Sequence, residues 1–352
     1  MLTRVRDWKV PENVQLVVSR LIEGLPVCQE KMQCAFRTMM RGELPDSLVA
    51  ALLVRLPTQH LTAAELTATT RVVREFLIPV NAKCAQPPID LCGTGGDSQG
   101  TFNVSTTASF VAAAAGCYVA KHGNRSVSSS CGSADLLEAV GINLTLTPEQ
   151  IALCLEQVGM GFMFTPLHRP ALPGLNKVRK ELAVRTVFNA MGPLTNPAGA
   201  KVQLVGVFGR ELVPVMAQTL RALDSERALV VHGEDGLDEI SLSGPTFVAE
   251  LRSGQIREYT LHPHDLGLDT APLDAIRVRS AEHAKAIFMG VLHNEAGPPR
   301  DIVMLNSAAA LYLAGKVETL VEGVHMAAET LKTGKALGKY ESLVAYTQSF
   351  LC

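Results

Sequence analysis

The feature that most restricts the fold of this chain is a glycine-rich loop between an apolar segment and a run of small, helix-forming residues. Gly93, Gly95 and Gly96 follow the apolar segment 88–91 and precede the alanine-rich segment 105–115. Glycine lets backbone N–H groups approach a ligand closely, and the start of the following helix presents unpaired N–H groups and a positive dipole end. The pattern predicts a strand, an anion-binding loop and a helix. A turn that needs glycine only for its shape is the alternative.

The overall composition agrees with a globular protein of one large or two modest domains. The chain has 352 residues, 47% of them hydrophobic, and a formal net charge of −2. It has no basic tail or long run of like charges, so we expect no binding to nucleic acid, and any anion site must be local. Its first residues lack the apolar core of a signal peptide, and no apolar run reaches the ~20 residues of a membrane helix. We therefore expect a cytoplasmic protein that does not enter a membrane.

The eight cysteines include no Cys-x-x-Cys pair, and several stand in apolar surroundings. Both features are typical of buried free thiols, so we expect reduced, structural cysteines rather than disulfides or a zinc site. Cys131 lies in a polar loop beside basic residues, where a thiol can become reactive. A small packing residue is the more frequent explanation for it.

The periodicity of apolar residues divides the chain into two parts. From Pro11 to about Pro79, apolar residues recur at intervals of three and four, which predicts about four helices. One helix start is marked by Pro45 and another by Thr62–Glu65, which has the spacing of a capping box. We expect a helical N-terminal domain at 1–80, joined by part of 170–200, a hinge at 81–88, and a second domain at 88–352.

The second part alternates short strands with helices. We expect strands at 89–92, 118–122, 161–164, 202–208 and 227–232, helices at 105–115, 134–140, 211–223 and from 281 onward, and a hairpin of 246–251 and 256–261. This alternation predicts an α/β domain with a mixed, mainly parallel central sheet and helices on both faces. In such sheets ligands bind at the carboxyl ends of the strands, where the loops 93–103 and 123–133 would then lie.

A second polar loop, 121–135, follows the next expected strand. It combines Lys121 and Arg125 with four serines before Cys131 and with two glycines. Serine hydroxyls, backbone N–H groups and a lysine are suitable partners for a second phosphate group. A solvated surface turn is the alternative, and His122 is more often a packed residue than a general base.

Four carboxylates occur between Glu234 and Glu239, at the end of an apolar strand. Adjacent acids repel one another unless a cation or solvent relieves them, and Mg²⁺ is commonly held by one or two carboxylates with water and substrate phosphates. Beside two phosphate loops, Asp238 and Glu239 suit a metal-bridged pyrophosphate. An acidic solvated loop, or a carboxylate pair for glycosidic acid–base catalysis, is the alternative.

A helical, arginine-rich segment at 173–196 interrupts the alternation of strands and helices. Within it, Arg179 is a candidate for binding a carboxylate through its forked guanidinium group. An arginine on a helix usually faces solvent, however, so the residue type alone leaves this open.

These clusters, in this order, resemble the anthranilate phosphoribosyltransferase family, which shares its fold with pyrimidine nucleoside phosphorylases. The resemblance covers nearly the whole chain and is carried by Gly93–Asp97, Thr101–Thr106, Lys121–Ser129, Arg185–Pro197 and Leu237–Glu239. It implies a helical domain hinged to an α/β domain, a homodimer formed through the helical domain, and 5-phosphoribosyl 1-pyrophosphate (PRPP) in the cleft. The implied activity, in tryptophan biosynthesis, is phosphoribosyl transfer from PRPP to anthranilate, which gives N-(5-phosphoribosyl)anthranilate and pyrophosphate.

The resemblance also implies a role for each matching residue. PRPP would be bound by Gly93, Gly96, Asp97, Thr101, Asn103, Val104, Ser105, Thr106, Lys121, His122, Gly123, Asn124, Arg125, Ser126, Val127, Ser128, Ser129 and Ser133. Anthranilate would contact Gly93, Asn124 and Arg179, with Arg179 facing its carboxylate. Ser105, Asp238 and Glu239 would hold Mg²⁺, as two ions.

The implied mechanism needs no general base. Departure of magnesium pyrophosphate leaves positive charge on the ribosyl carbon, and the aromatic amine attacks from the opposite face. The chain departs from the family pattern near the acceptor, because Thr165-Pro-Leu-His-Arg169 stands where Ala-Pro and a following His are common.

Two alternative functions follow from the same residues. A pyrimidine nucleoside phosphorylase of this fold would need a pyrimidine-reading segment, whereas the chain has Arg179 and the run Gly192–Pro197. A non-catalytic paralogue that binds nucleic acid would show a basic surface and eroded carboxylates, whereas the net charge is −2 and Asp238 and Glu239 are present.

Overall fold

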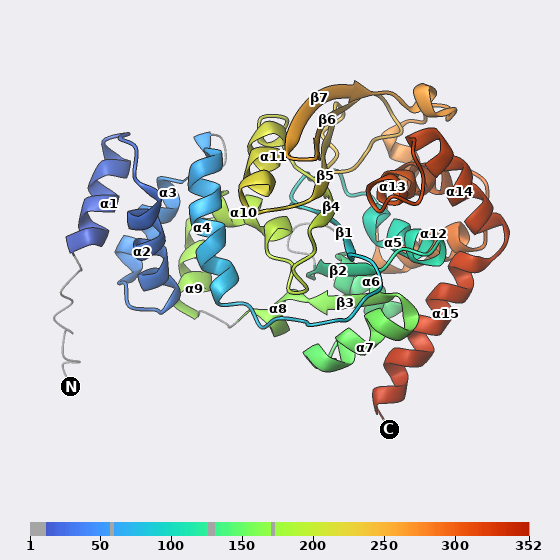
Figure 1. Cartoon of the computed structure of the whole chain (residues 1–352), viewed down its shortest axis with the longest axis horizontal. Helices are drawn as coiled ribbons and strands as arrows, with labels where there is room; N and C mark the ends of the chain where they lie inside the picture. Colours follow the sequence, from blue (N-terminus) through green and yellow to red (C-terminus); the bar gives the residue numbers. More distant parts are fainter. Residues whose placement is uncertain (1–11, 57–59, 126–130, 170–172, 352) are drawn as a thin grey trace.

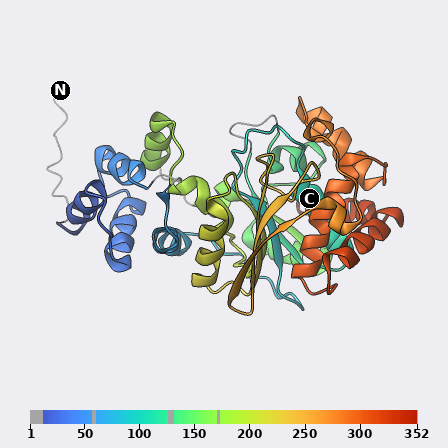
Figure 2. The same cartoon turned by 90° about the horizontal axis from the view of Figure 1, so that it is seen from above.

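The computed structural model describes residues 12–56, 60–125, 131–169 and 173–351. They form a small helical domain at one end and a larger α/β domain (Figures 1 and 2). The helical domain begins with α1 (Glu12–Ile22), α2 (Gln29–Met40), α3 (Asp46–Val54) and α4 (Ala63–Glu75). The four helices expected between residues 11 and 79 are thus confirmed.

Local sequence explains where two of these helices begin. At the start of α4 the Thr62 hydroxyl accepts a hydrogen bond from the Glu65 amide at 3.2 Å, and the Thr62 amide donates to the Glu65 carboxylate at 2.9 Å. This capping box satisfies two of the amides that a helix start leaves unpaired. Pro45 has an extended backbone immediately before α3, as the sequence predicts.

A later segment returns to the helical domain. Helix α9 (Pro173–Leu182) packs against α3, and an ion pair of 2.9 Å joins Lys177 to Asp46. The Val187 amide, at the start of α10 (Val187–Met191), donates to the Leu56 carbonyl at 2.9 Å. Two stretches that are distant in the sequence therefore pack together at this end of the molecule.

The α/β domain is organised around one seven-stranded sheet. Its strands are β1 (Ile89–Gly93), β2 (Val119–Gly123), β3 (Met160–Phe164), β4 (Val202–Gly206), β5 (Arg227–Gly233), β6 (Thr246–Arg252) and β7 (Gln255–Leu261). They lie in the order β3-β2-β1-β4-β5-β6-β7; the first five are mutually parallel, and β6 and β7 form an antiparallel hairpin at one edge. The mixed, mainly parallel sheet is confirmed, with every expected strand within two residues of its predicted bounds.

The helices of this domain are α5 (Val104–Ala114), α6 (Ser133–Ala139), α7 (Pro148–Val158), α8 (Thr165–His168), α11 (Leu212–Ala222), α12 (Ala281–Leu292), α13 (Pro298–Leu313), α14 (Leu320–Lys332) and α15 (Lys335–Gln348). The sequence-based expectations omit α7, although Thr147 and Gln150 form a capping box at its start. The helices expected from residue 281 onward are α12 to α15.

Both faces of the sheet are buried in separate cores. Leu91 and Leu204 point into the core formed with α5, α13 and α15, whereas Cys92 and Val205 point into the core formed with α10 and α11. The second core continues into the helical domain, where Phe188 of α10 lies 6.3 Å from Phe36 of α2, measured between ring centroids. This continuity fixes the helical domain against the sheet near the ends of β1 and β4.

The connection between α4 and β1 is held by backbone hydrogen bonds. The Ile78 amide donates to the His168 carbonyl at 2.8 Å, and the Val80 amide donates to the Pro197 carbonyl at 3.0 Å. The connection from the helical domain to β1 therefore contacts α8 and the end of the segment that returns to the helical domain.

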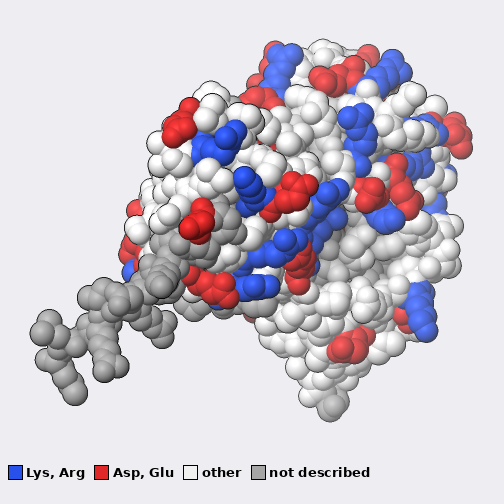
Figure 3. Space-filling view, turned by 60° about the vertical axis from the view of Figure 1, so that its left-hand side comes forward, with Lys and Arg blue, Asp and Glu red and all other residues white. Residues whose placement is uncertain are grey.

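Three further observations concern the surface and the cysteines. Within the described part of the chain, every helix is too short or too polar to span a lipid bilayer. Charged side chains of both signs are interspersed on the face in Figure 3, with Lys and Arg gathered near its middle. The seven cysteines of the described residues are free thiols, and Cys131 is buried, with its pKa raised to about 11 by burial and nearby acids.

Candidate active site

The carboxyl ends of the parallel strands bring the predicted loops together. Gly93 at the end of β1 pairs with Gly206 at the end of β4, and Gly123 at the end of β2 pairs with Phe164 at the end of β3. The loops after β1 and β2 therefore leave the sheet at the same edge. Strand order reverses between β1 and β4, which is where parallel sheets bind their ligands.

The glycines of the first loop are required by its geometry. Gly95 and Gly96 have φ values of +65° and +75°, a conformation that other residues rarely adopt. A Cβ atom at Gly93 would lie 2.4 Å from the Asp238 carboxylate. The loop is therefore shaped to let the acidic residue approach the end of β1.

The acidic residues contact the glycine loop and the first turn of α5. The Asp238 carboxylate accepts a hydrogen bond from the Gly95 amide at 2.8 Å, and the Glu239 carboxylate accepts one from the Ser105 amide at 2.9 Å. These contacts join a segment near residue 240 to two points of the loop that starts at Gly93. The sequence-based grouping of Ser105, Asp238 and Glu239 agrees with this arrangement.

The carboxyl groups of this cluster have raised pKa values. Burial and the neighbouring Asp97 raise the pKa of Asp238 to about 7, and burial and Asp238 raise the pKa of Glu239 to about 8. Burial also raises the pKa of Asp97. Carboxylates that are crowded and partly desolvated are stabilised by a cation, so this donor set fits a divalent metal ion such as Mg²⁺.

Lys121 links the second loop to the same cluster. Its side chain is 2% exposed, and its ammonium group donates to the Leu91 carbonyl and, at 3.2 Å, to the Ser105 hydroxyl. Its positive charge lowers the pKa of Glu239 and so opposes the effect of burial. At the start of α5, the buried Oδ1 atom of Asn103 has no hydrogen-bond partner among the described residues, while its amide nitrogen donates to the Cys131 carbonyl.

The side chain of His122 is fully engaged beneath the loop. Its Nδ1 atom lies 2.7 Å from the Asp90 carboxylate and its Nε2 atom lies 2.9 Å from the Gly192 carbonyl. Both partners are acceptors, an arrangement that is satisfied by an imidazolium, which has a hydrogen on each ring nitrogen. Burial opposes this charge, but Asp90 and the Gly192 carbonyl outweigh it and raise the pKa of His122.

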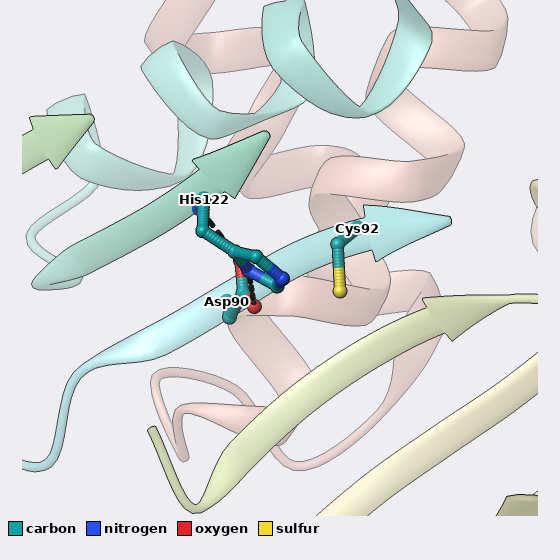
Figure 4. A group of neighbouring side chains, drawn as sticks. All are labelled: Asp90, Cys92 and His122. Carbon is teal, nitrogen blue, oxygen red and sulfur yellow. Dashed lines mark hydrogen bonds and ion pairs between the residues drawn. The ribbon is translucent and has the colours of Figure 1, made fainter. Parts of the chain in front are cut away.

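Asp90, Cys92 and His122 form a close group of potential metal ligands, drawn in Figure 4. Asp90 and His122 point at each other, and the Cys92 thiol lies beside them on the same strand as Asp90. The hydrogen bonds of His122 leave no free ring nitrogen, and burial raises the pKa of Cys92 well above its usual value. This group is therefore a buried ion pair with a neutral thiol beside it.

Other residues of the second loop contact the start of α6. The Ser133 hydroxyl, in the first turn of α6, donates to the Asn124 carbonyl at 3.3 Å, and a Cβ atom at Gly123 would lie 2.2 Å from that hydroxyl. Arg125 forms ion pairs with Asp135 and Glu138 of α6. The remaining residues assigned to this loop lie outside the described residues: Ser126, Val127, Ser128 and Ser129.

Three residues assigned to PRPP lie between the first loop and α5. Thr101 pairs with Arg277 in an isolated bridge, and Val104 and Thr106 are buried in the start of α5.

Arg179 is partly removed from solvent, whereas an arginine on a helix is usually exposed. Its guanidinium lies 5.1 Å from the centroid of the Phe188 ring, and the side chain is half-buried. Burial lowers the pKa of Arg179. It forms no ion pair with a described residue, so its charge is available to an anion.

Arg185 makes a contact that the sequence did not reveal. Its guanidinium donates to the Gly96 carbonyl and lies 4.3 Å from the centroid of the Phe208 ring. The segment that carries Arg179 is thereby attached to the glycine loop. Residue type alone gave no signal for this contact, because it joins positions 89 residues apart.

Comparisons with known proteins agree with the two-domain architecture. Residues 15–77 match the helical bundle domain of a glycosyl transferase family, and residues 85–337 match the a/b domain of that family. The fold and its glycine-lined acidic site therefore define a glycosyl transferase of this two-domain class.

Relatives that align over nearly the whole chain show which family of this class it belongs to. The chain is 48% identical over 335 residues to the anthranilate phosphoribosyltransferase of Nitrosomonas europaea, and the aligned region covers 95% of this chain and 98% of the relative. The crystal structure of the Thermus thermophilus enzyme of the same name has a TM-score of 0.88 and 42% identity, and covers 94% of this chain and 99% of the other. The Saccharomyces cerevisiae enzyme in complex with PRPP and Mg has the same fold, with a TM-score of 0.87 at 24% identity over 97% of this chain and 99% of the other. The chain belongs to the anthranilate phosphoribosyltransferase family.

Proposed function

We propose that this chain catalyses the reaction of its family, transfer of the phosphoribosyl group from PRPP to anthranilate in tryptophan biosynthesis, at the carboxyl ends of β1, β2 and β4. The observation that carries the proposal is the contact of Asp238 and Glu239 with the amides of Gly95 and Ser105. It places a cation-seeking acidic pair against a glycine loop and a helix start, the combination that binds a metal-bridged pyrophosphate.

PRPP is held mainly by backbone N–H groups and small polar side chains. The glycine loop and the start of α5 supply Gly93, Gly96, Asp97, Thr101 and Asn103 to Thr106, and the second loop supplies Lys121 to Ser129 with Ser133. The buried, unpartnered Oδ1 atom of Asn103 supports this assignment because such an atom is stabilised by a ligand donor. His122 supports the loop from beneath, since both of its ring nitrogens are already bonded.

Ser105, Asp238 and Glu239 would hold Mg²⁺, and we propose two ions because the family resemblance implies them. When bound, magnesium neutralises charge on the pyrophosphate leaving group. The chain's own contribution is to keep these oxygens in place through the amides of Gly95 and Ser105. The raised pKa values of Asp238 and Glu239 support a cation there, since a cation relieves the repulsion between them.

Anthranilate contacts Gly93 and Asn124, and its carboxylate faces Arg179. The unpaired, half-buried guanidinium of Arg179 supports this role. Catalysis comes from positioning and charge stabilisation without a general base, because the aromatic amine is itself the nucleophile. His122 is not offered as a general base, because both of its ring nitrogens are already bonded within the protein.

We further propose a homodimer formed through the helical domain, in the cytoplasm. Leu16, Ile22 and Val54 on α1 and α3 are between 41% and 60% exposed, which is apolar surface that a second copy would cover. The free thiols agree with a reducing compartment. Light scattering of the pure protein should give twice the mass of the chain, and a monomeric mass would contradict the dimer.

The activity is tested by adding the pure protein to PRPP, Mg²⁺ and anthranilate and following anthranilate fluorescence. We expect the fluorescence to fall with time, and to stay constant when PRPP is omitted or EDTA is added. No change at high protein concentration would contradict the proposal. Phosphate-dependent release of base from uridine or thymidine would instead indicate a phosphorylase.

A further inference from the structure

The far side of the glycine loop is held by a segment that is distant in the sequence. The Phe102 amide, just before α5, donates to the Ile276 carbonyl at 3.0 Å. Next to this bond, Thr101 and Arg277 pair as an isolated antiparallel bridge. The segment that precedes α12 therefore runs alongside the part of the loop that contains Thr101, a residue assigned to PRPP.

Gln99 stands at the centre of this contact, and all four of its polar groups are bonded. Its backbone amide donates to the Asp97 carboxylate at 3.3 Å, and its backbone carbonyl accepts a hydrogen bond from the Arg277 guanidinium at 3.0 Å. Its side-chain oxygen accepts from the same guanidinium at 3.2 Å, and its side-chain nitrogen donates to the Asp235 carbonyl at 3.1 Å. The side chain of Gln99 thus joins the loop and Arg277 to the acidic turn that follows β5.

Asp235 orders the acidic turn that receives this contact. Its carboxylate accepts hydrogen bonds from the Ser241 hydroxyl at 2.6 Å and from the Leu237 amide at 3.1 Å. Leu237 directly precedes the proposed metal ligands Asp238 and Glu239. The glycine loop is therefore tied to the same turn that presents the two carboxylates.

The glycine loop needs external support because of its backbone conformation. Ser98 and Gly100 have φ values of +60° and +68°, and Gly95 and Gly96 lie in the same left-handed region. A residue other than glycine is strained there, and ordering a loop costs conformational entropy. If the loop were free before PRPP arrived, the substrate would have to order it and would bind more weakly.

We propose that Gln99 and Arg277 are positioning residues for PRPP, which hold the glycine loop in its binding conformation against the acidic turn before the substrate arrives. This inference rests on the proposed function. Arg277 is itself held in place, because its guanidinium donates to the Asp274 carboxylate at 2.6 Å. The contacts of Gln99 with Arg277 and Asp235, here called the clasp, connect the loop that binds PRPP to the carboxylates that bind magnesium.

The first test compares the wild type with Gln99→Met, which keeps the length of the side chain and loses both of its hydrogen bonds. In calorimetric titrations with PRPP and Mg²⁺ we expect the Kd for PRPP to rise about tenfold, as for the loss of two hydrogen bonds of ordinary strength. In steady-state kinetics KM for PRPP should rise similarly, while KM for anthranilate should change by less than about twofold.

Hydrogen exchange provides a readout without any ligand. The Val278 amide donates to the Gly100 carbonyl at 2.8 Å, so its protection depends on the position of the loop. This amide should exchange faster in Gln99→Met than in the wild type, because the loop opens more often when the clasp is lost.

Variants of Arg277 test whether the two residues act together. If Gln99 and Arg277 form one clasp, the double variant Gln99→Met, Arg277→Met should lose about as much PRPP affinity as the more affected single variant, instead of the product of the two losses. Arg277→Lys keeps one donor without the fork, so its Kd for PRPP should lie between those of the wild type and Arg277→Met.

Gln348→Met is the matched control. The side chain of Gln348 also donates to a backbone carbonyl, that of Gly141 at 2.7 Å, but it belongs to α15. We expect its Kd for PRPP and its KM values to equal those of the wild type.

An unchanged Kd for PRPP in Gln99→Met, or losses that multiply in the double variant, would overturn the proposal. Equal losses for PRPP and anthranilate together with a lower melting temperature would also overturn it, since Gln99 would then only support the fold. If Gln99→Met does not fold, Arg277→Met and Arg277→Lys decide by the same measurements. If the wild type binds PRPP without converting anthranilate, the proposed function fails, and calorimetry and hydrogen exchange still test the clasp.

Discussion

A Cβ atom at Gly206 would lie 1.5 Å from the carbonyl oxygen of Asp238, so the end of β4 and the acidic loop meet through their backbones alone. Gly206 pairs with Gly93, where a Cβ atom would meet the Asp238 carboxylate itself. The two glycines form a notch that receives Asp238. The position of the proposed metal ligand is thus set by the absence of two side chains.

Replacing Gly206 with Ala should displace Asp238, because an overlap with backbone cannot be relieved by a rotamer change. We expect a loss of roughly 2–3 kcal/mol in the free energy of unfolding and about 100-fold in kcat/KM for PRPP. Urea unfolding and steady-state kinetics measure both effects. Gly244→Ala is the matched control, because a Cβ atom there meets nothing within 4 Å; equal behaviour of the two variants would contradict the notch.

The metal-free protein should lose stability as pH rises from about 4 to 8. Folding raises the pKa of Asp238 to about 7 and that of Glu239 to about 8, whereas the ordinary pKa of both groups is near 4. Between pH 4 and these raised values, the folded state therefore binds more protons than the unfolded state. Stability is therefore greatest below pH 4 for these groups and falls as they ionise.

Urea unfolding in EDTA at pH 5 and pH 8 tests this dependence. The free energy of unfolding of the double variant Asp238→Asn, Glu239→Gln, taken relative to that of the wild type, should be roughly 2 kcal/mol higher at pH 8 than at pH 5. Adding Mg²⁺ should stabilise the wild type more at pH 8 than at pH 5, and should not stabilise the double variant. A constant difference between the two proteins across this range would show that the carboxyl groups titrate normally.

His122 should also contribute stability that is lost as pH rises. Unlike Asp238 and Glu239, it is a group whose charged form is favoured by folding. Its pKa is raised, so its contribution is fully present below its unfolded pKa near 6.5 and is lost as pH rises through the folded value. The stability difference between wild type and His122→Gln should therefore shrink from pH 6 to pH 9. Nitrogen NMR should show both ring nitrogens protonated at pH 7; a neutral ring would contradict the assignment.

Arg179→Ala should raise KM for anthranilate far more than KM for PRPP. The guanidinium is proposed to bind the acceptor carboxylate, and a hydrogen bond to a charged group contributes about 1.5–3 kcal/mol. Steady-state kinetics with each substrate varied in turn measure the two constants. Equal increases in both would indicate that Arg179 serves the structure of the cleft through its contact with Phe188.

Arg185→Ala should raise KM for PRPP more than KM for anthranilate. The loss of the hydrogen bond to the Gly96 carbonyl frees the glycine loop, and we expect KM for PRPP to rise about tenfold. Arg257→Ala is the control, since Arg257 also lies near an aromatic ring, at 5.8 Å from Tyr259, but on the exposed strand β7. If KM for PRPP is unchanged in Arg185→Ala, the Gly96 contact does not shape the loop.

Most elements of the fold could be predicted because their signals are local. The capping box at Thr62 and the change of apolar periodicity near residue 81 are properties of short segments, and the capping box is confirmed. Helix α7 was missed although Thr147 and Gln150 provide the same signal. The carboxyl-end location of both loops followed from the expected parallel sheet, and the pairings of Gly93 with Gly206 and of Gly123 with Phe164 agree with it.

The site was predictable in its residue types and not in its contacts. Asp238 and Glu239 were expected near the glycine loop, but nothing local shows that they accept hydrogen bonds from Gly95 and Ser105. His122 was assigned to PRPP, and the structure shows its ring bound to Asp90 and Gly192 instead of to the loop surface. These contacts depend on strand order, which sequence periodicity does not encode.

The sequence by itself determined the two-domain architecture, the alternation that gives a parallel sheet, and the inventory of anion-binding and metal-binding groups. These depend on periodicity, on turn chemistry and on residue type, which act over a few residues. Only the tertiary structure decided that Gly206 admits Asp238, that Arg185 reaches Gly96, and that Arg179 lies half-buried over the Phe188 ring. Packing brings together residues that are far apart in the chain, and their charges and protonation states follow from that packing.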